Sequence, residues 1–364
     1  MKFNILNILI YLITSITLFG NLLMALIGPP ALFIFFVFVF RDLLVVVMFI
    51  LFALKADFKN QVSLAVIWLI CAILFSLAFL LTGEIQIGSF VEKFRNMFAI
   101  PAFCFVVMQN KSFGTVSTNL LVLFGIFCLV EAAFIMTLNS AIFLEITNFK
   151  SYLSSKNTEV GYGFGLFGQH RLLTPMFQPS LGGIFLSAII IFLYRNKRWI
   201  FATVFIIPLI MTVSKTGIIL LILWPIINFA PIASVLALSL TPILALQFLY
   251  TIDNIHVSSI VYHFKGYFEG FEHLLDPQGV GNTGTVGSLA GREVGAESGL
   301  GAFLAGFGAF GLIPLLIMFT KRLDTFAYLF LISFMFTEIS MNLYIAAIFL
   351  TLITTVNSHE KVSQ

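Results

Sequence analysis

Long apolar runs separated by short polar segments dominate the pattern of this chain. A helix needs about 20 apolar residues to cross the hydrocarbon core of a membrane, and about twelve runs approach that length. They cover, approximately, residues 5–27, 31–54, 62–82, 96–109, 117–138, 175–194, 199–213, 217–230, 232–250, 298–319, 323–337 and 340–356. The pattern therefore predicts an all-α, polytopic integral membrane protein with about 12 transmembrane helices in a single transmembrane domain, residues 1–364.

Composition agrees with this prediction. Hydrophobic residues make up 60% of the chain and charged residues 10%, whereas an ordinary soluble domain has about 25% charged residues. The mean hydropathy is +1.07. This composition excludes an ordinary soluble protein. We expect the chain to contact membrane lipid and not to bind nucleic acid.

The basic residues of the short loops predict the orientation of the chain, because such residues accumulate on the cytoplasmic side of a membrane. Placing the N-terminus in the cytoplasm puts this set on the inner side: Lys2, Lys55, Lys59, Lys111, Arg195, Lys197, Arg198, Lys321, Arg322 and Lys361. The agreement favours an even number of spans, with both termini cytoplasmic. Two long loops, residues 139–174 and 251–297, then lie on the outer, periplasmic face.

Two charges interrupt the second apolar run, at Arg41 and Asp42. A charge at the middle of a membrane helix costs about 2.5 to 3.5 kcal/mol on insertion scales. The pair is therefore expected to face the protein interior, where it ties helices together, or a water-filled cavity. The first interpretation is favoured.

The first long loop brings His170 and Arg171 next to Pro175 and Pro179. Proline is tolerated at membrane depth only where the freed backbone groups find partners or line a cavity, so a broken helix beside an arginine indicates a site. The alternative is an anchoring arginine beside an ordinary proline kink. Further on, Lys215 follows Ser214 between two apolar runs, where it either binds phosphate as a point charge or caps a turn.

The second long loop begins with an amphipathic helix over residues 257–275. Its apolar residues recur at helical spacing, its other face carries Lys265, and Pro277 stops it. Such a helix is expected to lie along the outer membrane interface. His263 falls at the edge of the apolar face, where a histidine has either a structural role or, beside Lys265, a functional one.

A glycine-rich segment follows, with Arg292 near its end. Glycine permits positive φ angles and close backbone approach, so the amides around Gly279 and Gly281 are candidates to line a site. The segment ends at Glu297 and Ser298, directly before the apolar run 298–319. A carboxylate thus lies at the lip of a predicted membrane helix.

Several cations lie on the outer face, where the orientation of the chain does not require them: Arg95, Arg171, Lys215, Lys265 and Arg292. Basic groups on separate outer segments suit an anionic ligand, and arginine binds phosphate with two parallel hydrogen bonds. For Arg95, anchoring at lipid headgroups is an equally good explanation. The expected anion is a lipid pyrophosphate.

With these residues in place, the chain resembles the bacterial O-antigen polymerase and ligase superfamily of membrane glycosyltransferases. Three ordered features carry the resemblance, namely Arg171, Thr174, Phe177, Pro179 and Ser180; Ser214, Lys215, Thr216 and Gly217; and Pro277, Gly279, Gly281, Glu297, Ser298, Gly308 and Gly311. The chain departs from the family pattern at Thr174, where glycine is usual, and at Phe177, which comes one place late. Ligases of this superfamily typically have a histidine near Glu297, so the chain looks more like a polymerase.

The resemblance implies glycosyl transfer on the periplasmic face of the bacterial inner membrane, from an oligosaccharide linked to undecaprenyl pyrophosphate. Arg171 and Arg292, assisted by Lys215, would hold the pyrophosphate, and Glu297 or, alternatively, His263 would take the acceptor proton. Arg95, Lys265, His170, Gly279, Gly281 and Ser298 are the further candidates for substrate binding. No Asp-x-Asp or clustered His and carboxylate motif indicates a metal, so a reaction without metal or cofactor is expected, and a chain-length regulator is a candidate partner. The rival functions are an O-antigen ligase and a transporter or flippase of lipid-linked sugar.

Overall fold

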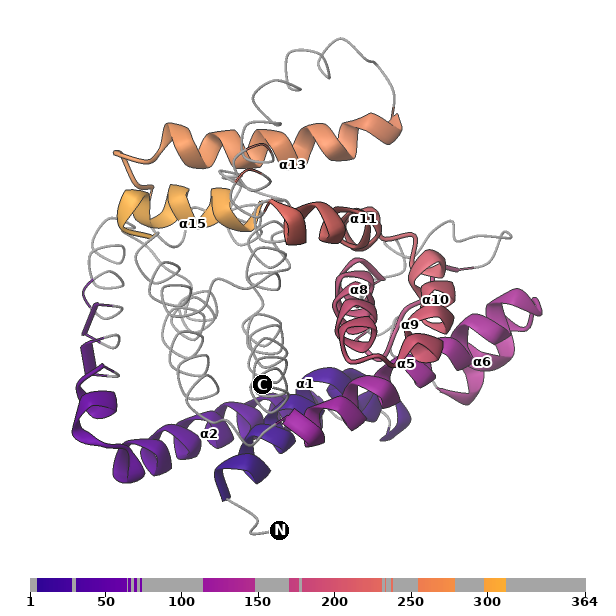
Figure 1. The fold of residues 1–364 in the computed structure, drawn as a ribbon, viewed down its shortest axis with the longest axis horizontal. Helices are drawn as coiled ribbons and strands as arrows, with labels where there is room; N and C mark the ends of the chain where they lie inside the picture. The colour runs from indigo at the N-terminus through magenta and orange to yellow at the C-terminus, as the bar shows by residue number, and fades with distance from the viewer. Residues whose placement is uncertain are drawn as a thin grey trace. The chain divides into compact units, whose positions relative to one another are not determined.

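The computed structural model describes residues 5–27, 31–63, 65–66, 69–70, 73, 114–147, 170–176, 179–230, 233, 237, 255–278 and 298–311. All regular structure in these residues is helical, as predicted (Figure 1). Contacts divide the chain into two compact units. Unit 1 comprises Met1–Phe52, Asn110–Leu223 and Thr351–Gln364, and unit 2 comprises Ala53–Gln109 and Trp224–Leu350.

The long apolar runs at the start of the chain form long helices. Helix α1 spans Ile5–Ile27, α2 spans Ala31–Lys55 and α5 spans Gly114–Met136. By length and composition, Ile5–Ile27 and Thr118–Met136 are long and apolar enough to cross a membrane. These helices agree with the predicted runs 5–27, 31–54 and 117–138 to within a few residues.

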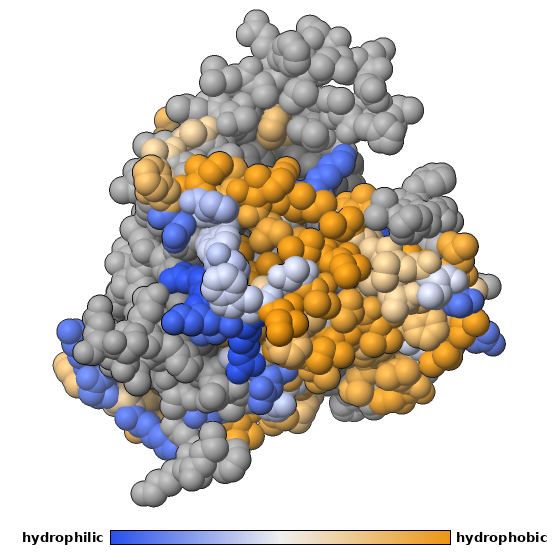
Figure 2. Space-filling view, turned by 45° about the vertical axis from the view of Figure 1, so that its right-hand side comes forward, coloured by the Kyte–Doolittle hydropathy of each residue, from blue (hydrophilic) through white to orange (hydrophobic). Residues whose placement is uncertain are grey.

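Large apolar side chains cover much of the face seen in the space-filling view (Figure 2). Leu26 on α1, Leu43 on α2 and Leu123 on α5 are each more than half exposed. Soluble monomers seldom expose large contiguous apolar patches. The exposed faces therefore suit contact with lipid, which agrees with membrane association.

Of the charged pair of α2, Arg41 is buried and Asp42 is partly exposed. The side chain of Arg41 is 6% exposed, and its Nε lies 3.4 Å from Oδ1 of the neighbouring Asp42. Arg41 therefore faces the protein interior.

Helix α8, Pro179–Arg195, forms the core of unit 1. Every residue from Leu181 to Leu193 is buried, as expected for a helix that is hydrophobic all round. It packs against α5 and against the short helices α9, Trp199–Val204, and α10, Ile206–Met211. The helix begins at Pro179 rather than at the predicted residue 175, because proline suits the first position of a helix and not its interior.

Two further helices begin in unit 1. Helix α11, Lys215–Phe229, corresponds to the predicted run 217–230, and its residues up to Leu223 belong to unit 1. Helix α6, Ser140–Ile146, lies within the segment 139–174, which the sequence analysis treated as a loop. Its Phe143 is buried against α5, with ring centroids 5.9 Å from Phe127 and 5.4 Å from Phe134.

The described part of unit 2 is built around two helices that run side by side, α13, Ile255–Glu272, and α15, Gly299–Phe307 (Figure 1). A Cβ added to Gly301 of α15 would collide with the carbonyl oxygen of Gly266 on α13, and one added to Gly270 would collide with the backbone of Gly301. The spacing of Gly266 and Gly270 is the GxxxG pattern, which lets two helix backbones approach closely. Helix α13 confirms the helix predicted over 257–275.

Helix α15 is shorter than the predicted span 298–319. It ends at Phe307, and Gly308 has a φ of +63°, after which a short 3-10 helix, Gly308–Gly311, follows. Glycine adopts this left-handed conformation without steric cost, so the helix can break here. The break is stabilised by a hydrogen bond of 2.8 Å from the Ala309 N–H to the carbonyl of Leu274.

Candidate functional site

The predicted residues His170 and Arg171 lie in a short segment, residues 170–176, that leads into α8 and that we call the arginine loop. This loop docks on the turn between α10 and α11, residues 212–214, which we call the α10–α11 turn. The Leu172 N–H donates to the carbonyl of Met211 at 3.0 Å. The arginine loop and the α10–α11 turn thus lie side by side although Arg171 and Val213 are 42 positions apart in the sequence.

The guanidinium of Arg171 strengthens this junction. Its Nε donates to the carbonyl of Thr212 at 2.8 Å, and its Nη2 donates to the carbonyl of Val213 at 3.1 Å. Burial lowers the pKa of Arg171 from its ordinary value, but arginine remains protonated in proteins. A permanent positive charge is therefore held in a fixed position.

A second predicted cation begins the next helix. Lys215 is the first residue of α11 and is exposed, and the carbonyls that hold Arg171 belong to the residues three and two positions before it. Ser214 caps the start of α11, because its Oγ accepts from the Gly217 N–H at 3.2 Å. The structure thus brings the predicted residues Arg171 and Lys215 to one junction.

Small residues allow α8 and α11 to meet beneath this junction. Ser214 Oγ donates to the carbonyl of Ser180 at 3.0 Å, and Ser187 Oγ donates to the carbonyl of Gly217 at 2.6 Å. A Cβ added to Gly217 would lie 2.6 Å from the carbonyl oxygen of Gly183. The serine and glycine residues of the family-like pattern therefore fix the α10–α11 turn against α8.

Both segments of the junction contain a strained residue. Thr174 in the arginine loop has a φ of +62°, and Val213 in the α10–α11 turn has a φ of +50°. The left-handed conformation costs residues other than glycine roughly 1 to 2 kcal/mol. Thr174 therefore has a backbone conformation that glycine adopts more easily, and glycine is usual at this place in the family that the sequence resembles.

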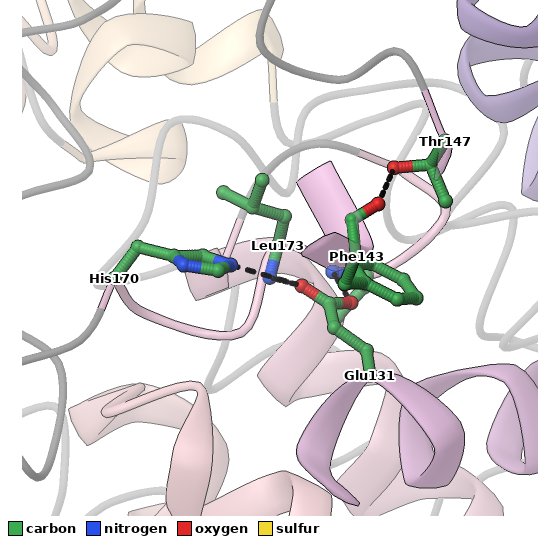
Figure 3. A network of polar contacts seen from close by, with 6 residues as sticks. Glu131, Phe143, Thr147, His170 and Leu173 are labelled. Atoms are coloured by element: carbon green, nitrogen blue, oxygen red, sulfur yellow. Dashed lines mark hydrogen bonds and ion pairs between the residues drawn. The ribbon is translucent and has the colours of Figure 1, made fainter. Parts of the chain in front are cut away.

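Glu131, which was not among the predicted site residues, anchors the arginine loop to α5. Glu131 of α5 is completely buried, and its carboxylate accepts from the N–H of Leu173 at 2.6 Å and from that of Thr174 at 3.0 Å (Figure 3). His170 Nε2 lies 3.8 Å from Oε1 of Glu131. The signal was present in the sequence, because an ionisable residue within a predicted span indicates a functional site.

The predicted residues of unit 2 have local structural partners. Ser298 is the N-cap of α15, and its Oγ accepts from the Gly301 N–H at 3.0 Å. Lys265 is half exposed, and its Nζ lies 3.6 Å from Glu269 one turn further along α13. His263 belongs to α13, but its side chain lies outside the described residues.

Five predicted site residues lie outside the part of the chain that the structure describes: Arg95, Gly279, Gly281, Arg292 and Glu297. Their roles remain predictions. The described geometry therefore supports a site at the arginine loop, made from His170, Arg171, Lys215 and the additional Glu131.

No protein-family model, curated protein or solved structure matches the chain.

Proposed function

We propose that this protein is a membrane glycosyltransferase that polymerises oligosaccharide repeat units linked to undecaprenyl pyrophosphate, as O-antigen polymerases do. In this proposal the chain crosses the bacterial inner membrane about twelve times, with both termini in the cytoplasm. Its site faces the periplasm, where the repeat units of a surface polysaccharide are joined. A chain-length regulator is a candidate partner.

One observation carries the proposal, namely the fixed position of Arg171 beside the start of α11. Two carbonyls of the α10–α11 turn orient its guanidinium through Nε and Nη2. Nη1 has no hydrogen-bond partner among the described residues, and we propose that it binds the ligand. Together with the exposed Lys215, this arrangement suits a pyrophosphate, which carries several negative oxygens.

The proposed reaction uses these cations as electrostatic stabilisers. The acceptor hydroxyl attacks the anomeric carbon of the donor sugar, and the bond to the lipid pyrophosphate breaks. Negative charge then increases on the pyrophosphate, where preorganised donors stabilise it most effectively. Arg171 and Lys215 are the proposed donors, and the role of Arg292 as a further donor is proposed from the sequence alone.

The remaining predicted residues have proposed roles around this centre. Glu297 is the proposed base for the acceptor hydroxyl, with His263 as the alternative from the sequence. Gly279 and Gly281 are proposed to offer backbone amides to the substrate. Arg95, Lys265, His170 and Ser298 are the further proposed substrate contacts.

The test is the surface glycan ladder of a strain that lacks the gene. The strain is complemented with the wild type, Arg171→Ala, Lys215→Ala and the control Arg198→Ala, at matched membrane levels of protein. Arg198 is an exposed arginine at the start of α9. We expect the wild type and Arg198→Ala to restore the ladder, and Arg171→Ala to fail.

The deletion strain itself distinguishes the candidate functions. A polymerase deletion leaves single repeat units on the outer-membrane lipid. Polymer that remains on undecaprenyl pyrophosphate would indicate a ligase instead. Repeat units that never reach the periplasmic face would indicate a transporter, and either result would overturn the proposal.

A further inference from the structure

The buried carboxylate of Glu131 has no explanation in the proposed function. It lies in an apolar helix, at zero exposure, with Phe127 four positions before it and Phe134 three positions after it. Residues at this spacing share one face of a helix, and Phe143 of α6 packs against both rings. Glu131 therefore lies on the face of α5 that carries these aromatic residues, and an ionisable residue in an apolar helix of this kind indicates function.

The two hydrogen bonds from the arginine loop account for only part of what surrounds the carboxylate. Oε2 accepts from the Thr174 N–H, whereas Oε1 accepts from the Leu173 N–H and also faces His170 (Figure 3). The distance of 3.8 Å from Oε1 to His170 Nε2 is too long for a hydrogen bond in this structure. Hydrogen bonds of catalytic groups are often long without substrate and shorten when the reacting complex forms.

The two nitrogens of His170 have different surroundings. Nε2 is buried and has no hydrogen-bond partner in the described part of the chain, while the side chain as a whole keeps 14% exposure. The exposed part of the His170 side chain therefore does not include Nε2, the nitrogen that faces Glu131. In a neutral imidazole one nitrogen carries the hydrogen and the other accepts. A carboxylate beside Nε2 favours the hydrogen there, which leaves Nδ1 as the acceptor.

The neighbouring Arg171 guanidinium is bonded to the carbonyls of Thr212 and Val213 in the α10–α11 turn. The carboxylate that faces His170 is that of Glu131. This arrangement suits a ring that becomes positive during a reaction.

We propose that His170, in place of Glu297 or His263, is the proton acceptor of the glycosyl transfer and that Glu131 is its positioning residue, an inference that rests on the proposed function. The acceptor oxygen forms a bond to the anomeric carbon, and the bond from that carbon to the pyrophosphate oxygen breaks with its electron pair on the pyrophosphate. The hydroxyl proton moves to Nδ1 of His170. The imidazolium faces the Glu131 carboxylate and afterwards releases the proton to water.

This assignment places the proton acceptor in the loop that also carries the pyrophosphate-binding Arg171. The acceptor hydroxyl and the leaving group are then positioned by adjacent residues of one segment. Glu131 fixes that segment through the amides of Leu173 and Thr174 and stabilises the charge on His170. The relation of carboxylate, imidazole and reacting hydroxyl follows the logic of a catalytic triad.

The test measures kcat, and the KM for the acceptor, of the purified full chain in lipid vesicles with an undecaprenyl-pyrophosphate-linked repeat unit. The variants are His170→Gln, Glu131→Gln, Glu131→Asp and the double variant His170→Gln/Glu131→Gln. Glu145→Gln is the matched control, because Glu145 is an exposed carboxylate on α6. Glutamine at position 170 keeps a polar side chain but does not accept a proton at neutral pH.

We expect His170→Gln to lower kcat by about 100- to 10,000-fold, the usual contribution of a general base, with little change in the KM. Glu131→Gln should lower kcat less, and Glu131→Asp should recover part of the loss because it restores the charge. The double variant should be no worse than His170→Gln alone, since the two residues act as a unit. In His170→Ala, added imidazole should restore part of the activity, which a merely structural role would not allow.

The outcomes separate this inference from the proposed function. A wild type that polymerises, together with a His170→Gln variant that keeps most of its kcat, overturns the inference and leaves the polymerase. Effects of His170→Gln and Glu131→Gln that multiply overturn the pairing of the two residues. A wild type without polymerase activity overturns the proposed function, and the inference falls with it.

Discussion

The arginine loop of unit 1 and the α13–α15 pair of unit 2 are held in place by different kinds of contact. Charged side chains hold the loop, because Glu131 binds two of its amides and Arg171 binds two carbonyls of the neighbouring turn. In the helix pair, the absence of side chains at Gly266, Gly270 and Gly301 lets two backbones meet.

The difference indicates which region is built for chemistry. Buried charge and left-handed residues other than glycine add free energy to the folded state, and such strain persists where the surroundings over-determine it, often at functional sites. Close packing of glycines is a common way for apolar helices to associate. The arginine loop therefore has the features of a site, while the described part of unit 2 has the features of a scaffold.

The largest expected effect comes from removing the carboxylate that anchors the loop. Glu131→Leu leaves the buried amides of Leu173 and Thr174 without their acceptor. Each unpaired buried donor costs about 1 to 3 kcal/mol, so the free energy of unfolding should fall by about 2 to 6 kcal/mol. Thermal and denaturant unfolding of the detergent-solubilised protein measure this change.

The control for that variant is Glu145→Leu, at an exposed position of α6. Surface substitutions usually change stability by less than about 0.5 kcal/mol. Replacing both members of a buried ion pair by apolar residues often leaves the stability unchanged. Glu131→Leu differs, because the backbone N–H groups of Leu173 and Thr174 remain without an acceptor. Unchanged stability of Glu131→Leu would mean that charge does not hold the loop, and the contrast between the two regions would disappear.

A smaller effect is expected in unit 2 from Gly301→Val. The added side chain would meet the backbone of α13 at Gly266, which cannot rotate away as a side chain can. Overpacking typically costs about 1 to 3 kcal/mol, and a collision with backbone should reach the upper end. Gly301→Ala should give a smaller loss in the same unfolding measurement.

Ala309→Val is the control for Gly301→Val, because Ala309 is exposed in the 3-10 helix that follows α15. It adds the two γ carbons of valine at an exposed position, whereas Gly301→Val adds these two and the Cβ. If both valine variants lose the same stability, close packing of α13 and α15 is not what holds unit 2 together.

The sequence predicted the helices of both regions better than their contacts. Apolar runs predicted α1, α2 and α5 to within a few residues, and helical periodicity predicted α13. The length of an apolar run and the spacing of its apolar residues depend on one segment alone, so the sequence of that segment is enough to predict its helix. The grouping of Arg171 with Lys215 was also expected, since both cations lie where orientation does not require them.

The features that were missed depend on tertiary contacts. The sequence marks Glu131 as an ionisable residue in an apolar run, but its hydrogen-bond partners, the amides 42 and 43 positions away, cannot be predicted from that run. Helix α6 was taken for loop because its short apolar face becomes evident only against Phe127 and Phe134. The break at Gly308 depends on the Leu274 carbonyl, which the local apolar pattern of 298–319 does not reveal.

Alkaline pH should act on unit 2 through Tyr267 of α13. Burial raises the pKa of Tyr267 to about 12, compared with about 10 for an unfolded tyrosine. A raised pKa in the folded state means that the contribution to stability is fully present below about pH 10 and is lost as the pH rises towards about 12. Unfolding of the wild type should therefore become easier in that interval.

Tyr267→Phe keeps the ring that packs 4.9 Å from Phe271 and removes the hydroxyl. We expect it to reduce this alkaline loss, measured as the free energy of unfolding from pH 9 to pH 12, with about 1.36 kcal/mol for each pKa unit as an upper limit. Tyr194→Phe, at an exposed position of unit 1, is the control and should leave the loss unchanged. If both variants reduce the alkaline loss of stability equally, that loss cannot be assigned to Tyr267 of α13.

The smallest effect is expected at Thr174, and it sharpens the contrast most. Thr174→Gly relieves left-handed strain of roughly 1 to 2 kcal/mol, but glycine adds about 0.5 to 1 kcal/mol of backbone entropy loss. The net change should be an increase in the free energy of unfolding of between about 0 and about 1.5 kcal/mol. Thr174→Val keeps the strain and loses the hydroxyl that accepts from the Met176 N–H at 3.4 Å, so it should be the less stable of the two.

Activity should survive Thr174→Gly because the bond to Glu131 uses the backbone N–H at position 174, which both substitutions retain. Leu138→Gly is the control for relief of strain alone, since Leu138 has a φ of +59° and is exposed outside the site. If Thr174→Gly proves less stable than Thr174→Val, the contact of the Thr174 side chain with Gly182 holds the loop. The arginine loop would then depend on packing against a glycine, as the α13–α15 pair does, and buried charge would no longer distinguish the two regions.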